Sequence, residues 1–257
     1  EMHLIFDSKS WRKSAFPLYK WVRNHDRELN PDQDWADIFE MIEEIKASLV
    51  EHFPYPTIEV DFAEADDIIG VMCRSPLEPV LVVSNDKDFA ELAKHRKVEL
   101  YRPSLKDFWS VEDPKRFLYE LIMKGDKSDG VPNIYSPDDF LKTQALIKLA
   151  GVEKTPRAKP VSKKFMDTLW DAYQTDDEAI IEKEFGDLYK NFRRNRRLIS
   201  LNYIPDILVD SIKNSLQNMT RQPIMKCMEY MTSNNMDLLA RCISDFEPNR
   251  KMKISLI

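Results

Sequence analysis

Acidic residues gather at four points of this chain, at spacings that can hold metal ions. Asp7 ends the stretch MHLIFD, and two more acids follow the apolar run VLVV in VVSNDKDFAEL. Four acids lie within DFAEADD, and GDKSDG holds another two. The residues concerned are Asp7, Asp61, Glu64, Asp66, Asp67, Asp86, Asp88, Asp126 and Asp129.

Carboxylates that crowd at one site repel one another unless cations neutralise them. Two such charges about 4 Å apart repel by about 4 kcal/mol at an effective dielectric of ~20. Hard divalent cations remove this repulsion, and an all-oxygen ligand set suits Mg²⁺ or Mn²⁺. Two such ions can activate water and stabilise the transition state of phosphodiester hydrolysis. The chain has no GxSxG motif, and we interpret its four histidines as surface or edge residues.

Each acidic motif has a simpler interpretation when it is taken alone. A D-x-D after a strand also occurs in nucleotide-sugar transferases and phosphatases. The acids of EADD could merely favour a helix N-terminus, which contributes under ~1 kcal/mol, and GDKSDG could be only a turn. The three motifs together, in this order, favour a metal site.

The elements of the first half would bring these acids to one edge of a sheet. Strands are predicted at 2–7, 57–60, 80–83 and 97–101, with helices at 35–49, from about 64 to 72, and at 88–94. Asp34 is placed to cap the first of these helices, and Pro54 and Pro56 close it. Alternating strands and helices indicate a mostly parallel central sheet flanked by helices. Ligands bind at the carboxyl ends of such strands, where the acids lie.

The second half of the chain is predicted to be helical. Helical patterns cover 140–150, 163–173, 177–185, 206–216 and 224–231. The fold class is therefore α/β, with an α/β core over 1–124 and a helical domain over 125–257. We expect a further N-terminal segment, because the chain starts with Glu1 instead of Met and enters a strand almost at once.

Charge is segregated along the chain. The net charge is −6, yet three segments hold five basic residues each and no acid, at 8–24, 154–164 and 190–197. Such segregation favours a nucleic-acid partner in spite of the acidic total. No apolar run is long enough to span a bilayer. Three cysteines suit a reducing compartment such as the cytoplasm.

The sequence resembles a known superfamily. FAEADDIIGVM, VVSNDKDFAEL and LIMKGDKSDGVPNI together are similar to motifs of the flap endonuclease and 5′-nuclease superfamily. MHLIFDSKSWRKS and NRRLISLNYIP resemble segments of one of its branches, the RNase H of T-even bacteriophages. The resemblance covers about residues 3 to 215.

The resemblance implies a two-metal site with Mg²⁺, for which Mn²⁺ could substitute. It implies that the ligands of the first ion are Asp7, Glu64, Asp66 and Asp86. It implies that Asp88, Asp126 and Asp129 hold the second ion, in part through water. Asp67 is interpreted as structural or outer-sphere, with favourable charge at a helix N-terminus as its simpler role.

The resemblance also implies two nucleic-acid contacts. The stretch 8–34 falls where the family has a helical arch that guides single-stranded 5′ ends, and either Trp11 or Trp21 should be partly core. The stretch from Gly125 to Asn133 fits the opening of the family's helix–turn–helix. Candidate nucleic-acid contacts are Arg12, Lys13, Lys20, Arg23, Lys124, Lys127, Arg194 and Arg196.

The chain departs from the family pattern in two places. The usual GDxxDNIPGVxGIGxKTA continuation is replaced by VPNIYSPDDFLKT, which puts potassium binding, known in many relatives, in doubt. The family also has an earlier strand ending in Asp, which would lie before Glu1. We expect an omitted segment to supply it; otherwise the chain is catalytically impaired.

The predicted function is a metal-dependent 5′→3′ nuclease with RNase H and flap endonuclease activity. Its partners would be branched, nicked or flapped DNA and RNA–DNA hybrid, in lagging-strand primer removal. Two further candidate partners are a single-strand-binding protein and a sliding clamp, on which the C-terminal KMKISLI would dock. We expect no membrane partner. The alternatives are a catalytically impaired DNA-binding homologue, a PIN-type ribonuclease and, more remotely, a small-molecule phosphohydrolase.

Overall fold

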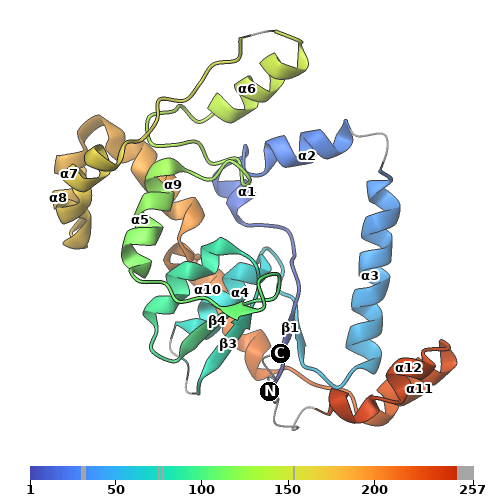
Figure 1. The fold of residues 1–257 in the computed structure, drawn as a ribbon. Helices are drawn as coiled ribbons and strands as arrows, with labels where there is room; N and C mark the ends of the chain where they lie inside the picture. Colours follow the sequence, from blue (N-terminus) through green and yellow to red (C-terminus); the bar gives the residue numbers. More distant parts are fainter. Residues whose placement is uncertain (30–32, 75, 77, 153, 248–257) are drawn as a thin grey trace. The chain divides into compact units, whose positions relative to one another are not determined.

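The structure is a computed structural model that describes residues 1–29, 33–74, 76, 78–152 and 154–247. It contains two compact units. Unit 1 comprises Glu1–Lys9, Pro31–Ala65 and Asp210–Ile257, and unit 2 comprises Ser10–Asn30 and Asp66–Val209. Figure 1 labels the α-helices of both units and the strands β1, β3 and β4. The assignment of domains to 1–124 and 125–257 stays a prediction.

Unit 1 holds a two-stranded sheet and a long helix. Strand β1 (Leu4–Ile5) pairs in parallel with β2 (Thr57–Ile58). Helix α3 (Trp35–His52) begins as predicted, because the Asp34 side chain accepts hydrogen bonds from the backbone N–H groups of Ala36 and Asp37. Its apolar side chains are less buried than the amphipathic pattern predicts: no residue of α3 is buried.

The remaining elements of unit 1 pack at the C-terminal end of α3. They include α11 (Ile224–Ser233), α12 (Asp237–Ala240) and the 3₁₀ turn η4 (Ile243–Phe246). The His52 ring stacks on Tyr230 of α11 at 4.6 Å, and Phe53 meets Phe246 edge-on at 6.1 Å between ring centroids. Aromatic contacts therefore hold this end of α3 in place. Helix α10 (Asp206–Gln217) connects the last part of unit 2 to unit 1.

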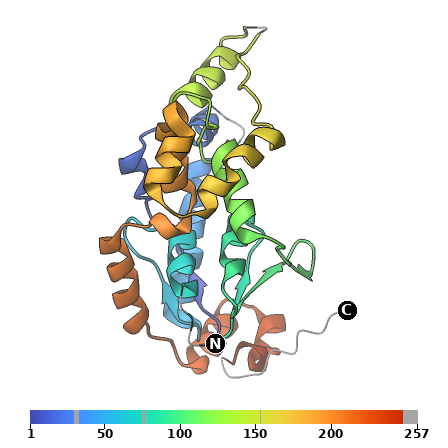
Figure 2. The ribbon, with the colours of Figure 1, turned by 90° about the vertical axis from the view of Figure 1, so that its left-hand side faces the viewer.

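Unit 2 contains the second sheet. Strand β3 (Val80–Val83) runs parallel to β4 (Val98–Arg102), which pairs in turn with the short antiparallel β5 (Asp107–Phe108; Figure 2). Val82 and Leu100 are buried with Phe89 and Leu92 on one side of this sheet. The described residues thus form two small sheets, and a single, mostly parallel central sheet is not confirmed.

Helices make up most of unit 2. The five helices predicted for the second half of the chain are all present, as α6, α7 and α8 in this unit and as α10 and α11, described above. The predicted helix after β3 is instead the 3₁₀ helix η1 (Lys87–Lys94). The other elements are α1 (Arg12–Ala15), α2 (Trp21–Glu28), α4 (Ala65–Cys73), α5 (Pro114–Lys124), α6 (Phe140–Leu149), α7 (Lys163–Gln174), α8 (Glu178–Phe185), η2 (Gly186–Leu188), α9 (Tyr189–Ile199) and η3 (Leu201–Tyr203).

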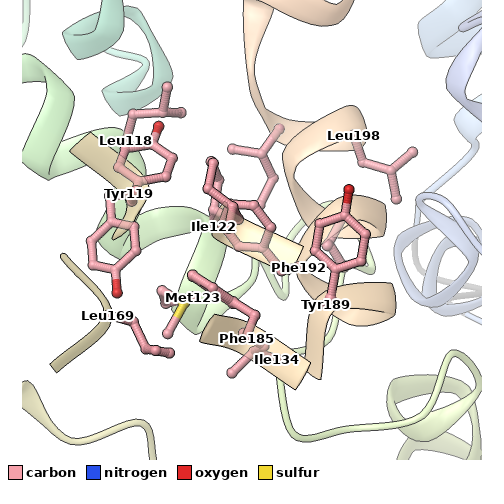
Figure 3. Packing of buried hydrophobic residues seen from close by; sticks show 14 of the residues in the cluster. Leu118, Tyr119, Ile122, Met123, Ile134, Leu169, Phe185, Tyr189, Phe192 and Leu198 are labelled. Carbon is pink, nitrogen blue, oxygen red and sulfur yellow. The ribbon is translucent and has the colours of Figure 1, made fainter. Parts of the chain in front are cut away.

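The main core of unit 2 lies between α5, α7, α8 and α9. Tyr119, Ile122 and Met123 of α5 and Phe192 of α9 are fully buried there (Figure 3). The Tyr119 hydroxyl donates a hydrogen bond of 2.8 Å to the carbonyl of Met166, so its one polar group is satisfied inside the core. This core gives the acids at the end of α5 a rigid base. No helix of the described residues is long and apolar enough to cross a membrane.

Candidate active site

Asp7 and Glu64 belong to unit 1. Asp7 follows β1 and is exposed, and its Oδ1 accepts a hydrogen bond of 2.7 Å from the backbone N–H of Ala65, the first residue of α4. A carboxylate is favourable at this position because helix N-termini carry unpaired N–H groups and partial positive charge. Asp7 therefore fixes the start of the segment that carries the next acids.

The carboxylates of Glu64, Asp66 and Asp67 form a compact group at the start of α4. One oxygen from each lies within 4.8 Å of the others, a spacing that can hold a metal ion. Asp67 is fully buried and has another partner, because the Arg12 guanidinium donates to both of its oxygens at 3.0 and 2.8 Å. This ion pair supports the prediction that Asp67 is structural.

Asp86 and Asp88 lie at the start of η1, directly after β3. Asp86 caps this helix by accepting a hydrogen bond of 2.9 Å from the backbone N–H of Asp88. The pKa of Asp88 is raised to about 7. Burial is the larger cause, and the negative charges of Asp86 and Asp126 add to it. Within the described part of the chain, no donor reaches the buried Oδ1 of Asp88. A crowded carboxylate with an unpaired buried oxygen fits a hard divalent cation.

Asp126 is buried in the turn that follows α5. Its Oδ1 accepts hydrogen bonds from the Ser128 backbone N–H at 2.8 Å and from the Ser128 hydroxyl. Its Oδ2 lies 2.6 Å from Nζ of Lys87. Burial raises the pKa of Asp126, but the hydrogen bonds from Lys87 and Ser128 outweigh it and hold the pKa below its usual value. A continued strand alternation would turn Lys87 away from the acids, but the structure brings its ammonium to Asp126.

Asp129 connects the same turn to the basic segment 8–24, which includes the start of α2. Tyr19 donates its hydroxyl to Asp129 Oδ2 at 2.9 Å, and Arg23 donates to Oδ1 at 2.7 Å. The Lys20 ammonium lies 3.8 Å from Oδ1. Burial raises the pKa of Asp129, and these neighbours counteract only part of that effect. Two of the predicted nucleic-acid contacts, Lys20 and Arg23, thus neutralise a predicted metal ligand.

Two glycines allow this turn to form. Gly125 has a φ of +71°, and a Cβ there would lie 2.5 Å from the carbonyl oxygen of Val131. Gly130 has a φ of +75°, and its Cβ would lie 2.8 Å from the carbonyl oxygen of Leu18. Both positions need glycine because of the positive φ and the close backbone. The turn conformation therefore explains why GDKSDG begins and ends with glycine.

The predicted phosphate-binding residues of the first basic segment divide into two kinds. Lys13 is exposed, as a phosphate contact requires. Arg12 is only 1% exposed and donates from Nε to the carbonyl of Leu198 as well as to Asp67. Its prediction as a nucleic-acid contact is wrong, because a guanidinium buried among these partners presents no surface to a phosphate. Trp11 is buried beside it, which bears out the expectation of a partly core tryptophan.

The basic residues of the second half divide in the same way. Lys124 pairs with Glu120 on α5, and Lys127 is exposed in the turn. Arg194 is about one-tenth exposed and pairs with Asp138, and Arg196 is buried against Glu178. Arg194 and Arg196 thus stabilise the fold, which corrects their prediction as nucleic-acid contacts.

Helix α9 presents a different set of cations to solvent. Its exposed basic side chains are Lys190, Arg193 and Arg197. They recur three and four residues apart, so they share one face of the helix. A helix predicted over KNFRRNRR would place these three cations on one exposed face. Phe192, Arg196 and Ile199 lie on the opposite, buried face.

Comparison with known proteins gives matches along nearly the whole chain. Residues 1–120 match the family "5'-3' exonuclease, N-terminal resolvase-like domain". Residues 116–246 match the family "T4 RNase H, C terminal".

Individual relatives and one solved structure agree with these matches. Ribonuclease H of Enterobacteria phage T4 is 28% identical over 241 residues, which cover 92% of this chain and 75% of that protein. Flap endonuclease Xni of Shewanella pealeana is 27% identical over 139 residues, half of each chain. The crystal structure of T5 D15 protein co-crystallised with metal ions shares the fold, with a TM-score of 0.53 at 16% identity and 84% coverage of both chains.

The fold, the clustered carboxylates and these matches define a class of enzymes, the 5′-3′ nucleases. Within this class, the chain belongs to the T4 RNase H family.

Proposed function

We propose that the protein is a divalent-metal-dependent 5′→3′ nuclease that removes RNA primers and adjacent DNA during lagging-strand replication. Its substrates are flapped, nicked and branched DNA and RNA–DNA hybrid, and its metal is Mg²⁺, with Mn²⁺ able to substitute. Family membership supports the reaction class. The observation that carries the proposal is the group of interacting acids in unit 2, in which the pKa of Asp88 is raised by burial and by its acidic neighbours.

The proposed ligands follow the sequence-based assignment. Asp7, Glu64, Asp66 and Asp86 would hold one ion, and Asp88, Asp126 and Asp129 the other. Bound ions would lower the pKa of an attacking water and neutralise charge that develops on the phosphate. Asp86 prepares this site by capping η1, which fixes the backbone of Asp88. The buried turn around Asp126 keeps its carboxylate oriented by hydrogen bonds from Ser128.

The nucleic-acid contacts are proposed for exposed cations. Lys13 and Lys127 are exposed in unit 2, and Lys190, Arg193 and Arg197 line one face of α9. We further propose that α5, the turn after it and α6 act as the helix–turn–helix-type duplex grip, and that the strands belong to one central sheet. Docking of KMKISLI on a sliding clamp concerns residues 251–257, which lie outside the described part of the chain. Recruitment by a single-strand-binding protein also stays a prediction.

The test is cleavage of end-labelled 5′-flap, nicked and RNA–DNA substrates with Mg²⁺ and with chelator. The proposal expects short 5′ products that appear only with the metal. Binding of flap DNA without cleavage under any divalent-metal condition would instead support the DNA-binding homologue. Cleavage of RNA alone would support the PIN-type ribonuclease.

A further inference from the structure

Asp126 has both carboxylate oxygens occupied by groups of the protein. The turn holds Oδ1 through Ser128 and, more weakly, through the Asp129 backbone N–H at 3.3 Å. Oδ2 accepts a hydrogen bond from Nζ of Lys87 at 2.6 Å. The Asp126 side chain is 5% exposed, whereas that of Lys87 is 48% exposed. A buried carboxylate is thus paired with a lysine whose side chain is free to move into solvent.

The backbone around Lys87 explains why its ammonium turns to this oxygen. Asp86 ends the extended segment and caps η1, so Lys87 is the first residue of a 3₁₀ helix and no longer follows the strand alternation. Its two chain neighbours are both acids. The ammonium therefore lies 2.6 Å from Oδ2 of Asp126, and the negative charges of Asp86 and Asp88 also attract it.

We propose that Lys87 is a resident counter-ion of Asp126 that competes with a divalent ion for Oδ2 and so weakens binding of the second ion. The inference rests on the proposed function, because it assumes that Asp126 is a metal ligand. A lysine and a metal ion cannot both occupy Oδ2 on the same side, so binding of the ion requires the ammonium to leave. Lys87 acts through Asp126, and it is therefore a positioning residue.

This role predicts two opposite effects when the charge is removed. Lys87→Met leaves buried Asp126 without its counter-ion, which destabilises the metal-free protein. The same change removes the competitor, so the second ion binds more tightly, by about tenfold. A purely structural lysine would give only the first effect, because loss of site geometry weakens metal binding.

The experiment is calorimetric titration of metal-free protein with Mn²⁺, together with thermal unfolding in chelator. Lys94→Met is the matched control: Lys94 lies on the same 3₁₀ helix and pairs at 3.1 Å with the buried carboxylate of Glu91, which is not a candidate metal ligand. Lys87→Met should bind the second Mn²⁺ about tenfold more tightly and unfold at lower temperature in chelator. Lys87→Arg should titrate like the wild type, because it keeps the charge, and Lys94→Met should leave Mn²⁺ binding unchanged.

The inference would be overturned if Lys87→Met bound the second Mn²⁺ no more tightly than the wild type. A lower unfolding temperature of this variant would not rescue it. In that case, metal-dependent cleavage by the wild type would leave the proposed function intact. A wild-type protein that takes up no Mn²⁺ and cleaves no substrate would overturn both.

Discussion

The guanidinium of Arg12 and the carboxylate of Asp67 form a two-point ion pair inside unit 2, with N–O distances of 3.0 and 2.8 Å. Both side chains are at most 1% exposed. The pair joins α1 to α4, and the Arg12 Nε donates in addition to the carbonyl of Leu198 at the end of α9. Asp67 is the acid next to Asp66, so the pair also fixes the part of α4 that carries a predicted metal ligand.

Removal of one partner of this pair should destabilise the protein strongly. Asp67→Asn leaves a buried guanidinium without its counter-charge, and the expected loss is about 3–5 kcal/mol in the free energy of unfolding. Urea unfolding at neutral pH in chelator measures it. Asp171→Asn, on an exposed face of α7, is the control and should change stability by less than about 0.5 kcal/mol. A small loss in Asp67→Asn would show that the pair does not hold α1 to α4.

Asp88 should make the metal-free protein less stable as pH rises. Its pKa is raised to about 7 in the folded state by burial and by Asp86 and Asp126, against about 4 in an unfolded chain. The stability that this carboxyl contributes is therefore complete below about pH 4 and is lost as pH rises through about 7. Asp88→Asn should gain stability relative to the wild type between pH 5 and pH 8. Urea unfolding in chelator at both pH values tests this, and a constant difference would contradict the raised pKa.

Loss of a single proposed metal ligand should abolish cleavage and leave substrate binding largely intact. Asp86→Asn and Asp66→Asn each keep side-chain size but remove a charged oxygen ligand, and cleavage of flap DNA should fall by at least ~100-fold. Fluorescence anisotropy with flap DNA in chelator measures binding separately. Turnover close to that of the wild type in either variant would refute its assignment as a ligand.

The exposed face of α9 should contribute to DNA affinity. Arg193→Gln and Arg197→Gln should each weaken binding of flap DNA, and each should lower the slope of log affinity against log salt by about 0.9 if one phosphate contact is lost. Arg196→Gln is the internal comparison, because Arg196 is buried against Glu178 and should affect unfolding instead of the salt slope. Equal salt slopes in all three variants and the wild type would exclude α9 from the interface.

Local patterns in the sequence predicted most elements. The spacing of apolar residues and the capping Asp34 predicted α3, and the apolar run VLVV predicted β3. Among the elements that these patterns do not predict are α5, β5 and α9. Strand β5 has only two residues, too few for an alternation to be seen. Helix α9 is so rich in arginine that its buried stripe of Phe192, Leu198 and Ile199 is hard to recognise.

The site was predicted as a set of acids, but the cations around it were not. Arg12 pairs with a residue 55 positions away, and no local pattern in the sequence carries that information. The position of Lys87 does not follow strand alternation, because the chain turns into a 3₁₀ helix after Asp86. Which arginines of a basic segment are buried depends on tertiary partners such as Glu178, so composition could not distinguish Arg196 from Arg193.

Asp129 is held by the basic segment through both its side chain and its backbone, since the Lys20 N–H also donates to the Asp129 carbonyl at 2.8 Å. A phosphate that attracts Arg23 removes a counter-charge from Asp129, and a cation that binds Asp129 releases Arg23. The two events therefore favour each other, and thermodynamic reciprocity requires that each strengthens the other by the same factor. On the proposed assignment of Asp129 as a metal ligand, nucleic acid and metal ion should therefore strengthen each other's binding through this one carboxylate.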